Sequence, residues 1–72
     1  MNLYFVKSTN IISVAYDEQK ELLTIEFKLE IIYQYYGVPL GEFVSFMKSE
    51  NVDHYFFNFI AIRYHYDEIR KI

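Results

Sequence analysis

Two hydroxyl side chains and one amide stand together near the N-terminus, at Ser8, Thr9 and Asn10. Neutral donors of this kind can hold a phosphate or a ribose. They can equally cap a turn by bonding to nearby backbone groups. The sequence leaves both interpretations open and makes these three residues candidates for ligand binding.

A second group of candidates lies toward the C-terminus, at His54, Arg63 and Tyr64. Arg63 could bind two oxygens of a phosphate, His54 could add a further donor, and Tyr64 could stack on a base. His54 and Arg63 are separated by about 2.5 helical turns, so one chain would not place them side by side, whereas two copies could. The alternative interpretation is a solvent-exposed helix face that carries a surface ion pair.

Three tyrosines form a third group, at Tyr33, Tyr35 and Tyr36. Phenol rings stack on nucleobases, at about 1–3 kcal/mol per base, but they also fill the cores of small domains. Because side chains alternate between the two faces of a strand, Tyr33 and Tyr35 share one face. We expect these two to be core residues, and Tyr36, on the opposite face, to be the ring available for stacking.

No pattern in the sequence predicts catalysis, a metal site or a cofactor. The chain has no cysteine, and its two glycines, Gly37 and Gly41, form no phosphate-binding loop. Glu50 with His54, and His65 with the acids that follow it, match no metal-binding motif. The serines lack the context of a nucleophile elbow. We therefore expect a protein that is not an enzyme.

Composition limits the class of partner. Ten acidic residues outnumber seven basic ones, for a formal net charge of −3. Affinity for a long nucleic acid needs several Lys or Arg contacts to phosphates, so the balance disfavours duplex DNA and favours a compact ligand with few phosphates. No apolar run is long enough to span a membrane, and the absence of cysteine fits a reducing compartment. We expect a cytoplasmic protein with no membrane contact.

Aromatic content predicts self-association. The 72 residues include seven Phe and eight Tyr, and 53% of the chain is hydrophobic. A domain of this size buries only about 60% of its unfolded surface, so some rings should remain exposed. Monomers rarely carry large apolar patches, and we therefore expect a homo-oligomer.

The sequence predicts a single domain over residues 1–72 that begins with strands. Residues 11–16 and 22–27 are rich in β-branched side chains, and the polar residues 17–21 between them are typical of a β-hairpin turn. Residues 31–36 form a third expected strand.

Two helices are expected after these strands. Pro39 suits the first position of one helix, and Asn51 suits the N-cap of another. The apolar residues of the second helix recur at helical spacing and include Tyr55, Phe56, Phe59 and Ile60. The expected fold is α+β, with a three-stranded antiparallel sheet followed by two C-terminal helices packed on one face. Residues 67–72 are predicted to be a charged, frayed end.

Several segments in this order resemble the KTSC domain family. The resemblance covers roughly Val6 to Tyr66. The segments are Ser8-Thr9-Asn10-Ile11, Val14-Ala15-Tyr16-Asp17, a strand that ends in Phe27, Tyr33-Gln34-Tyr35-Tyr36-Gly37-Val38-Pro39, and later Tyr55-Phe56, Ile60 and Tyr64. The family usually has glycine where this chain has Glu30, which implies a turn with positive φ at that point.

The resemblance also implies classes of function. KTSC domains occur alone in bacteria and their viruses and at the end of some lysyl-tRNA synthetases, and the family has been treated as a candidate RNA-binding module. Small stand-alone phage proteins also resemble nucleotide sponges, which bind cyclic oligonucleotide immune signals without cleaving them. Our hypothesis is an oligomeric protein that sequesters such a small nucleotide. The alternatives are an RNA-binding accessory domain and a protein–protein interaction module. The residues expected to bind the ligand are Ser8, Thr9, Asn10, Tyr36, His54, Arg63 and Tyr64.

Overall fold

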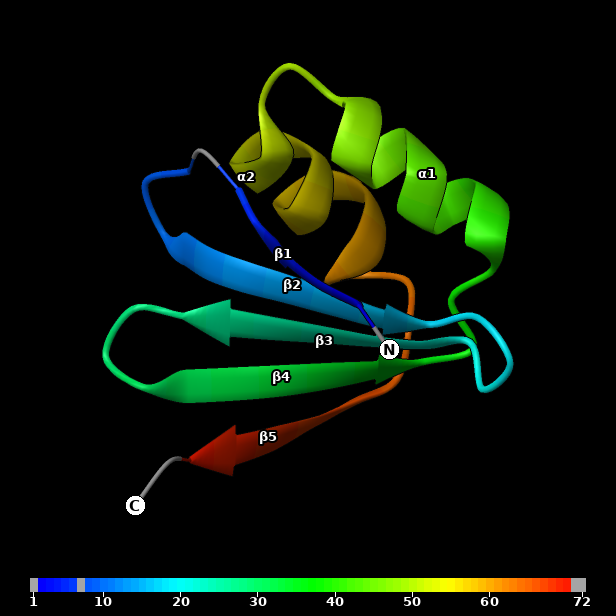
Figure 1. The fold of residues 1–72 in the computed structure, drawn as a ribbon, viewed down its shortest axis with the longest axis horizontal. Coiled ribbons are helices and arrows are strands. Elements are labelled where there is room, and N and C mark those ends of the chain that lie inside the picture. The colour runs from blue at the N-terminus through cyan, green and yellow to red at the C-terminus, as the bar shows by residue number, and fades with distance from the viewer. Residues whose placement is uncertain (1, 7, 71–72) are drawn as a thin grey trace.

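A computed structural model describes residues 2–6 and 8–70 and arranges the strands among them in one antiparallel sheet, in the order β1-β2-β3-β4-β5. The helices lie between β4 and β5 in the chain and sit together above the strands in Figure 1. The elements are β1 (Asn2–Phe5), β2 (Ile11–Asp17), β3 (Leu22–Phe27), β4 (Ile31–Tyr36), α1 (Leu40–Lys48), α2 (Val52–Tyr55), the π-helical turn η1 (Phe56–Ile60) and β5 (Tyr66–Arg70).

The expected α+β class, the antiparallel sheet and the two helices on one face are confirmed, but the expectation of three strands is wrong. Within the described residues the sheet has five strands. The two unexpected strands are its edges: β1 pairs with β2, and β5, which follows the helices, pairs with β4. An edge strand needs a neighbour on one side only and tolerates exposed charges. Residues 67–70 of the segment predicted to fray therefore belong to β5, although they lack the apolar–polar alternation of a buried strand, and residues 71 and 72 lie outside the described part of the chain.

The core lies between the sheet and the helices. Leu23 is opposite Tyr35 in the register of β3 and β4, and Ile25 is opposite Tyr33, so all four side chains share one face. Tyr35 is 3% exposed, and Tyr33 packs against the buried cluster, so both rings face the helices as predicted. The helices contribute the core residues Phe43, Phe46, Val52, Phe56 and Ile60.

The turn between β3 and β4 adopts left-handed backbone conformations. Leu29 has a φ of 71° and Glu30 a φ of 61°, a region that non-glycine residues rarely enter. The positive φ expected at Glu30 is present without glycine. The turn is tied to the neighbouring loop because the backbone N–H of Lys28 donates to the carbonyl of Asn10 at 3.0 Å.

The helix boundaries follow local signals. Asn51 caps α2, because its side-chain oxygen accepts a hydrogen bond from the backbone N–H of His54 at 3.0 Å, as predicted. Pro39 occupies the N-cap position of α1, so that helix begins at Leu40, one residue later than expected.

Candidate functional site

The loop of Ser8, Thr9 and Asn10 is fastened to the start of α2. The Ser8 hydroxyl donates to Asp53 Oδ1 at 2.7 Å, and the backbone N–H of Thr9 donates to Asp53 Oδ2 at 3.2 Å. The Ser8 oxygen in turn accepts hydrogen bonds from the backbone of Asn10 at 3.1 Å and of Ile11 at 2.9 Å. Ser8 therefore acts as a turn cap in this conformation, which is the second of the two interpretations open from sequence.

The surroundings of this loop are acidic. An open pocket beside it is lined by Ser8, Thr9, Glu50, Asn51 and Asp53. Burial alone would raise the pKa of Asp53, but hydrogen bonds from Ser8, Thr9 and Asn10 outweigh it and hold that pKa below its ordinary value of 3.8. The carboxylate is therefore ionised at neutral pH, and it makes the pocket unfavourable for a phosphate.

Asp53→Asn is expected to lower the free energy of unfolding at pH 7 by about 1–2 kcal/mol, because charge-assisted hydrogen bonds from the Ser8 loop are weakened. A carboxyl whose pKa is depressed by folding stabilises the fold above its unfolded pKa, and this contribution disappears as pH falls through the folded pKa. Urea denaturation from pH 2.5 to pH 7 should show a shallower acid limb for the variant. The matched control, Glu50→Gln, should keep the wild-type limb, and an unchanged limb in Asp53→Asn would contradict this account.

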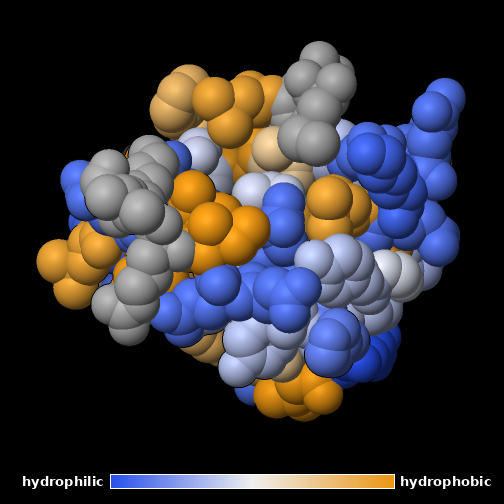
Figure 2. Space-filling model, turned by 90° about the horizontal axis from the view of Figure 1, so that it is seen from below, coloured by the Kyte–Doolittle hydropathy of each residue, from blue (hydrophilic) through white to orange (hydrophobic). Residues whose placement is uncertain are grey.

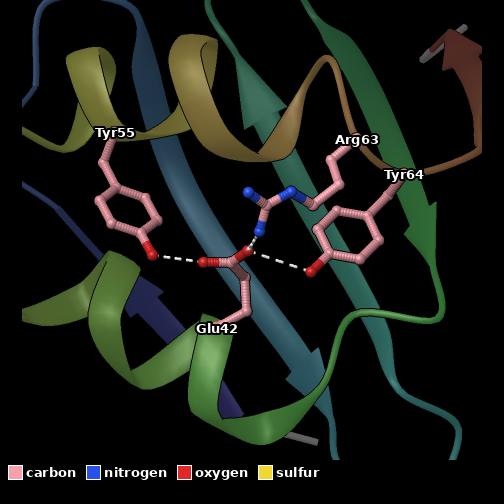
Figure 3. Close-up of polar contacts among 4 residues, drawn as sticks. All are labelled: Glu42, Tyr55, Arg63 and Tyr64. Carbon is pink, nitrogen blue, oxygen red and sulfur yellow. Dashed lines mark hydrogen bonds and ion pairs between the residues drawn. The ribbon is translucent and has the colours of Figure 1, made fainter.

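Arg63 and Tyr64 converge on Glu42 of α1, a residue that sequence reasoning missed (Figure 3). The Glu42 carboxylate accepts hydrogen bonds from Arg63 Nη1 and from the Tyr64 hydroxyl, each at 3.0 Å. It also accepts one from the hydroxyl of Tyr55. The Glu42 side chain is only 10% exposed, whereas that of Arg63 is 59% exposed. The cluster joins α1 to α2 and to the segment after η1, and it gives Arg63 the ion pair of the alternative interpretation.

Hydrogen bonding to this carboxylate affects the two phenols differently. For Tyr55, the hydrogen bond to Glu42 is the largest cause of a raised pKa. For Tyr64, burial is the largest cause and the bond to Glu42 adds to it. Both hydroxyls therefore stay protonated at neutral pH and donate to Glu42.

The remaining predicted residues lie elsewhere. The Tyr36 hydroxyl donates to Asp67 Oδ2 at 2.8 Å, and this hydrogen bond is the main cause of its raised pKa. His54 is exposed on α2, where the Asn58 amide donates to its carbonyl at 2.8 Å. The ligand-binding residues predicted from sequence therefore form no single site within one chain. They lie in three places: on α2 and the loop fastened to its start, in the Glu42 cluster, and on the β4–β5 pair.

Asn10 and Tyr33, from two of the groups picked out in sequence, do meet in one pocket. It has a volume of about 310 Å³ and lies at the turn between β3 and β4. We call it the aromatic pocket; its lining is Asn10, Phe27, Lys28, Leu29, Ile31, Tyr33 and Phe57. The Phe27 ring meets the Tyr33 ring edge to face at 5.4 Å between centroids and lies 6.4 Å from the Phe57 ring.

The aromatic pocket combines apolar rings with two polar side chains. A planar ring could stack between aromatic walls, the Asn10 amide can both donate and accept, and the Lys28 ammonium can pair with an anion. This composition, mainly apolar with a few polar groups, is that of small-molecule sites. Sequence reasoning missed Phe27, Lys28 and Phe57, because Phe27 follows the alternation of a core strand and Lys28 is a polar turn residue.

Metal binding and membrane crossing are two further possibilities for the described residues, 2–6 and 8–70. These residues contain no group of three or more His, Asp or Glu side chains that could hold a metal ion. None of their helices has the length and apolar character needed to cross a membrane.

Comparison with known proteins agrees with the architecture. The sequence profile of the KTSC domain matches residues 7–64, a span that includes every polar and aromatic residue of the aromatic pocket. The crystal structure of a KTSC domain protein from Yersinia pestis is similar, with a TM-score of 0.89 and 29% sequence identity, over 94% of this chain and 96% of that one. No curated protein matches the chain in sequence. The chain therefore belongs to the KTSC domain family.

Proposed function

We propose that this protein binds a small nucleotide in the aromatic pocket without turning it over. The observation that carries the proposal is the convergence of Asn10, Lys28 and three aromatic rings on one cavity. In this proposal the base stacks on Phe57, the Asn10 amide bonds to the edge of the base, and Lys28 pairs with a phosphate. The non-enzymatic part of the proposal rests on the lining, in which none of the described residues supplies a carboxylate or an imidazole for acid–base chemistry.

The size of the cavity bears on which nucleotide is bound. A volume of about 310 Å³ is near the lower limit of small-molecule sites, roughly 300–1,000 Å³, so one pocket suits a single nucleotide unit. A cyclic oligonucleotide signal would then engage the pockets of two or more copies. The proposed role is sequestration of such a signal by an oligomer in the cytoplasm, as in phage proteins that counter host defence. One ammonium and a net charge of −3 favour this compact ligand over an RNA polymer.

Phe57→Ala is expected to weaken nucleotide affinity about 10- to 100-fold, because stacking on an aromatic ring is worth about 1–3 kcal/mol per base. Isothermal titration calorimetry with AMP, GMP and cyclic di-AMP measures the change. Phe59→Ala is the matched control, since Phe59 is a ring of the same turn, 41% exposed and outside the pocket lining.

A second variant separates the base from the phosphate. Lys28→Ala should reduce affinity for nucleotides and leave affinity for the corresponding nucleosides unchanged, because the substitution removes only the ammonium that pairs with the phosphate. Wild-type protein that binds none of these ligands would contradict the proposal. Binding of RNA with a steep salt dependence would favour the RNA-binding alternative, and capture of a defined protein partner would favour the interaction module.

A further inference from the structure

The rings of the aromatic pocket do not choose between bases. Stacking on an aromatic side chain tolerates any base, because every nucleobase has a π face. Figure 2, which views the molecule from the side of β5, shows hydrophilic residues between separate hydrophobic patches, and apolar contact of this kind likewise carries no hydrogen-bonding pattern. Discrimination between nucleotides therefore depends on the hydrogen-bonding side chains of the aromatic pocket.

The backbone groups of Asn10 are both engaged, so its side-chain amide is the group that it offers to a ligand. Its backbone N–H donates to the Ser8 hydroxyl oxygen at 3.1 Å, and its backbone carbonyl accepts from the N–H of Lys28 at 3.0 Å. The second of these bonds also occupies the backbone N–H of Lys28, which therefore contributes its ammonium. The aromatic pocket thus offers one amide and one ammonium from this pair of residues.

The Asp53 carboxylate fixes which way the Asn10 amide faces. Hydrogen bonds of 2.7 Å from Ser8 and 3.2 Å from Thr9 hold this carboxylate beside the loop. The Asn10 side chain donates to the same carboxylate. An ionised carboxylate only accepts hydrogen bonds, so the amide turns its nitrogen, and not its oxygen, toward Asp53. The amide oxygen and the second N–H then remain as an acceptor and a donor side by side.

We infer that the aromatic pocket selects adenine nucleotides and that Asn10 is the residue that determines this specificity. The 6-amino group and N7 of adenine present a donor beside an acceptor, and a side-chain amide matches both. Guanine and hypoxanthine carry an oxygen at position 6 and present two acceptors along the same edge, so the amide can bond to only one of them. The inference rests on the proposed function, since it names the base that the same pocket binds.

Isothermal titration calorimetry of the full chain with AMP and IMP tests the inference, because the two nucleotides share ribose and phosphate and differ in the base at position 6. The wild type should bind AMP about 10- to 100-fold more tightly, the range of one bidentate hydrogen-bonded pair. Asn10→Ala should lower the affinity for AMP to that for IMP. Asn58→Ala is the matched control and should keep the preference, since Asn58 is exposed, donates to the His54 carbonyl and lies outside the pocket lining.

The outcomes separate this inference from the proposed function. Equal wild-type affinities for AMP and IMP would overturn adenine selection and leave nucleotide binding intact. Tighter binding of GMP than of AMP would also overturn it, because the Lys28 ammonium would then bind O6 and N7 of guanine. An Asn10→Ala variant that still prefers AMP would show that another group selects the base. Wild-type protein that binds none of the three nucleotides would refute the proposed function and the inference together.

Discussion

Phe56→Ala is expected to lower the free energy of unfolding by about 3–5 kcal/mol, the usual cost of emptying the site of a buried phenylalanine. Phe56 is 1% exposed, and its ring centroid lies 5.3 Å from those of Phe27 and Tyr35 and 6.5 Å from that of Phe46. It thus contacts the sheet and α1 together. At a typical stability per residue the whole domain has about 4–11 kcal/mol. Urea denaturation followed by circular dichroism should therefore show a variant that is close to unfolding at 25 °C.

A neighbouring ring supplies the control for this prediction. Phe59→Ala removes the same side chain from the same π-helical turn, but Phe59 is 41% exposed. Its loss is expected to cost about 1 kcal/mol or less, since little apolar surface is returned to water. Similar losses for the two variants would show that Phe56 does not join the sheet to the helices as described.

Glu42→Ala is expected to cost about 2–3 kcal/mol, the second-largest effect. The substitution leaves the hydroxyls of Tyr55 and Tyr64 without the carboxylate that accepts from both, and the Glu42 side chain is only 10% exposed. Partly buried donors that lose their acceptor keep much of their desolvation cost. The free energy of unfolding at pH 7, measured by urea denaturation, checks the value.

The exposed member of the same cluster should matter much less. Arg63 is 59% exposed, and exposed ion pairs contribute about 0–1 kcal/mol, so Arg63→Ala is expected to cost no more than that. Tyr55→Phe and Tyr64→Phe each remove one donor and should fall between the two. An Arg63→Ala variant as unstable as Glu42→Ala would mean that the ion pair, and not the pair of phenol hydrogen bonds, holds the helices together.

Those parts of the fold that local sequence patterns specify were predictable. The hairpin of β2 and β3 has alternating or β-branched strands around a polar turn, and Asn51 has both the residue type and the position of a helix cap. The edge strand β5 was missed for a physical reason. β5 exposes much of its surface, so Asp67 and Glu68 can occupy it and hide the pattern of a strand.

The aromatic helix was predicted less well because its geometry changes partway along. In η1 the backbone N–H of Ala61 donates to the carbonyl of Phe56, five residues earlier. This wider turn changes the spacing from that of an α-helix. Phe56 and Ile60 are buried, but Phe59, predicted on the apolar face, is exposed. Only Phe57 among the exposed rings of the turn lines the aromatic pocket.

Neither the Glu42 cluster nor the aromatic pocket could be predicted from the sequence, because both are formed by contacts between residues far apart in the chain. Glu42 lies in the first turn of a helix, where an acid is expected simply because it complements the helix dipole. Nothing in that pattern indicates a bond to Tyr64, 22 residues later. In the same way, Asn10 and Tyr33 were each recognisable as candidates, but only the sheet register and the turn at Leu29 bring them to one cavity.

The most direct test of nucleotide sequestration is mass spectrometry of the small molecules released by heat from purified protein, after incubation with a panel of linear and cyclic nucleotides. We expect an intact nucleotide to be recovered in stoichiometric amount from the wild type and from Phe59→Ala, and to be largely missing from Phe57→Ala. Wild-type protein that releases no nucleotide would contradict binding, and release of a cleaved product would contradict binding without turnover.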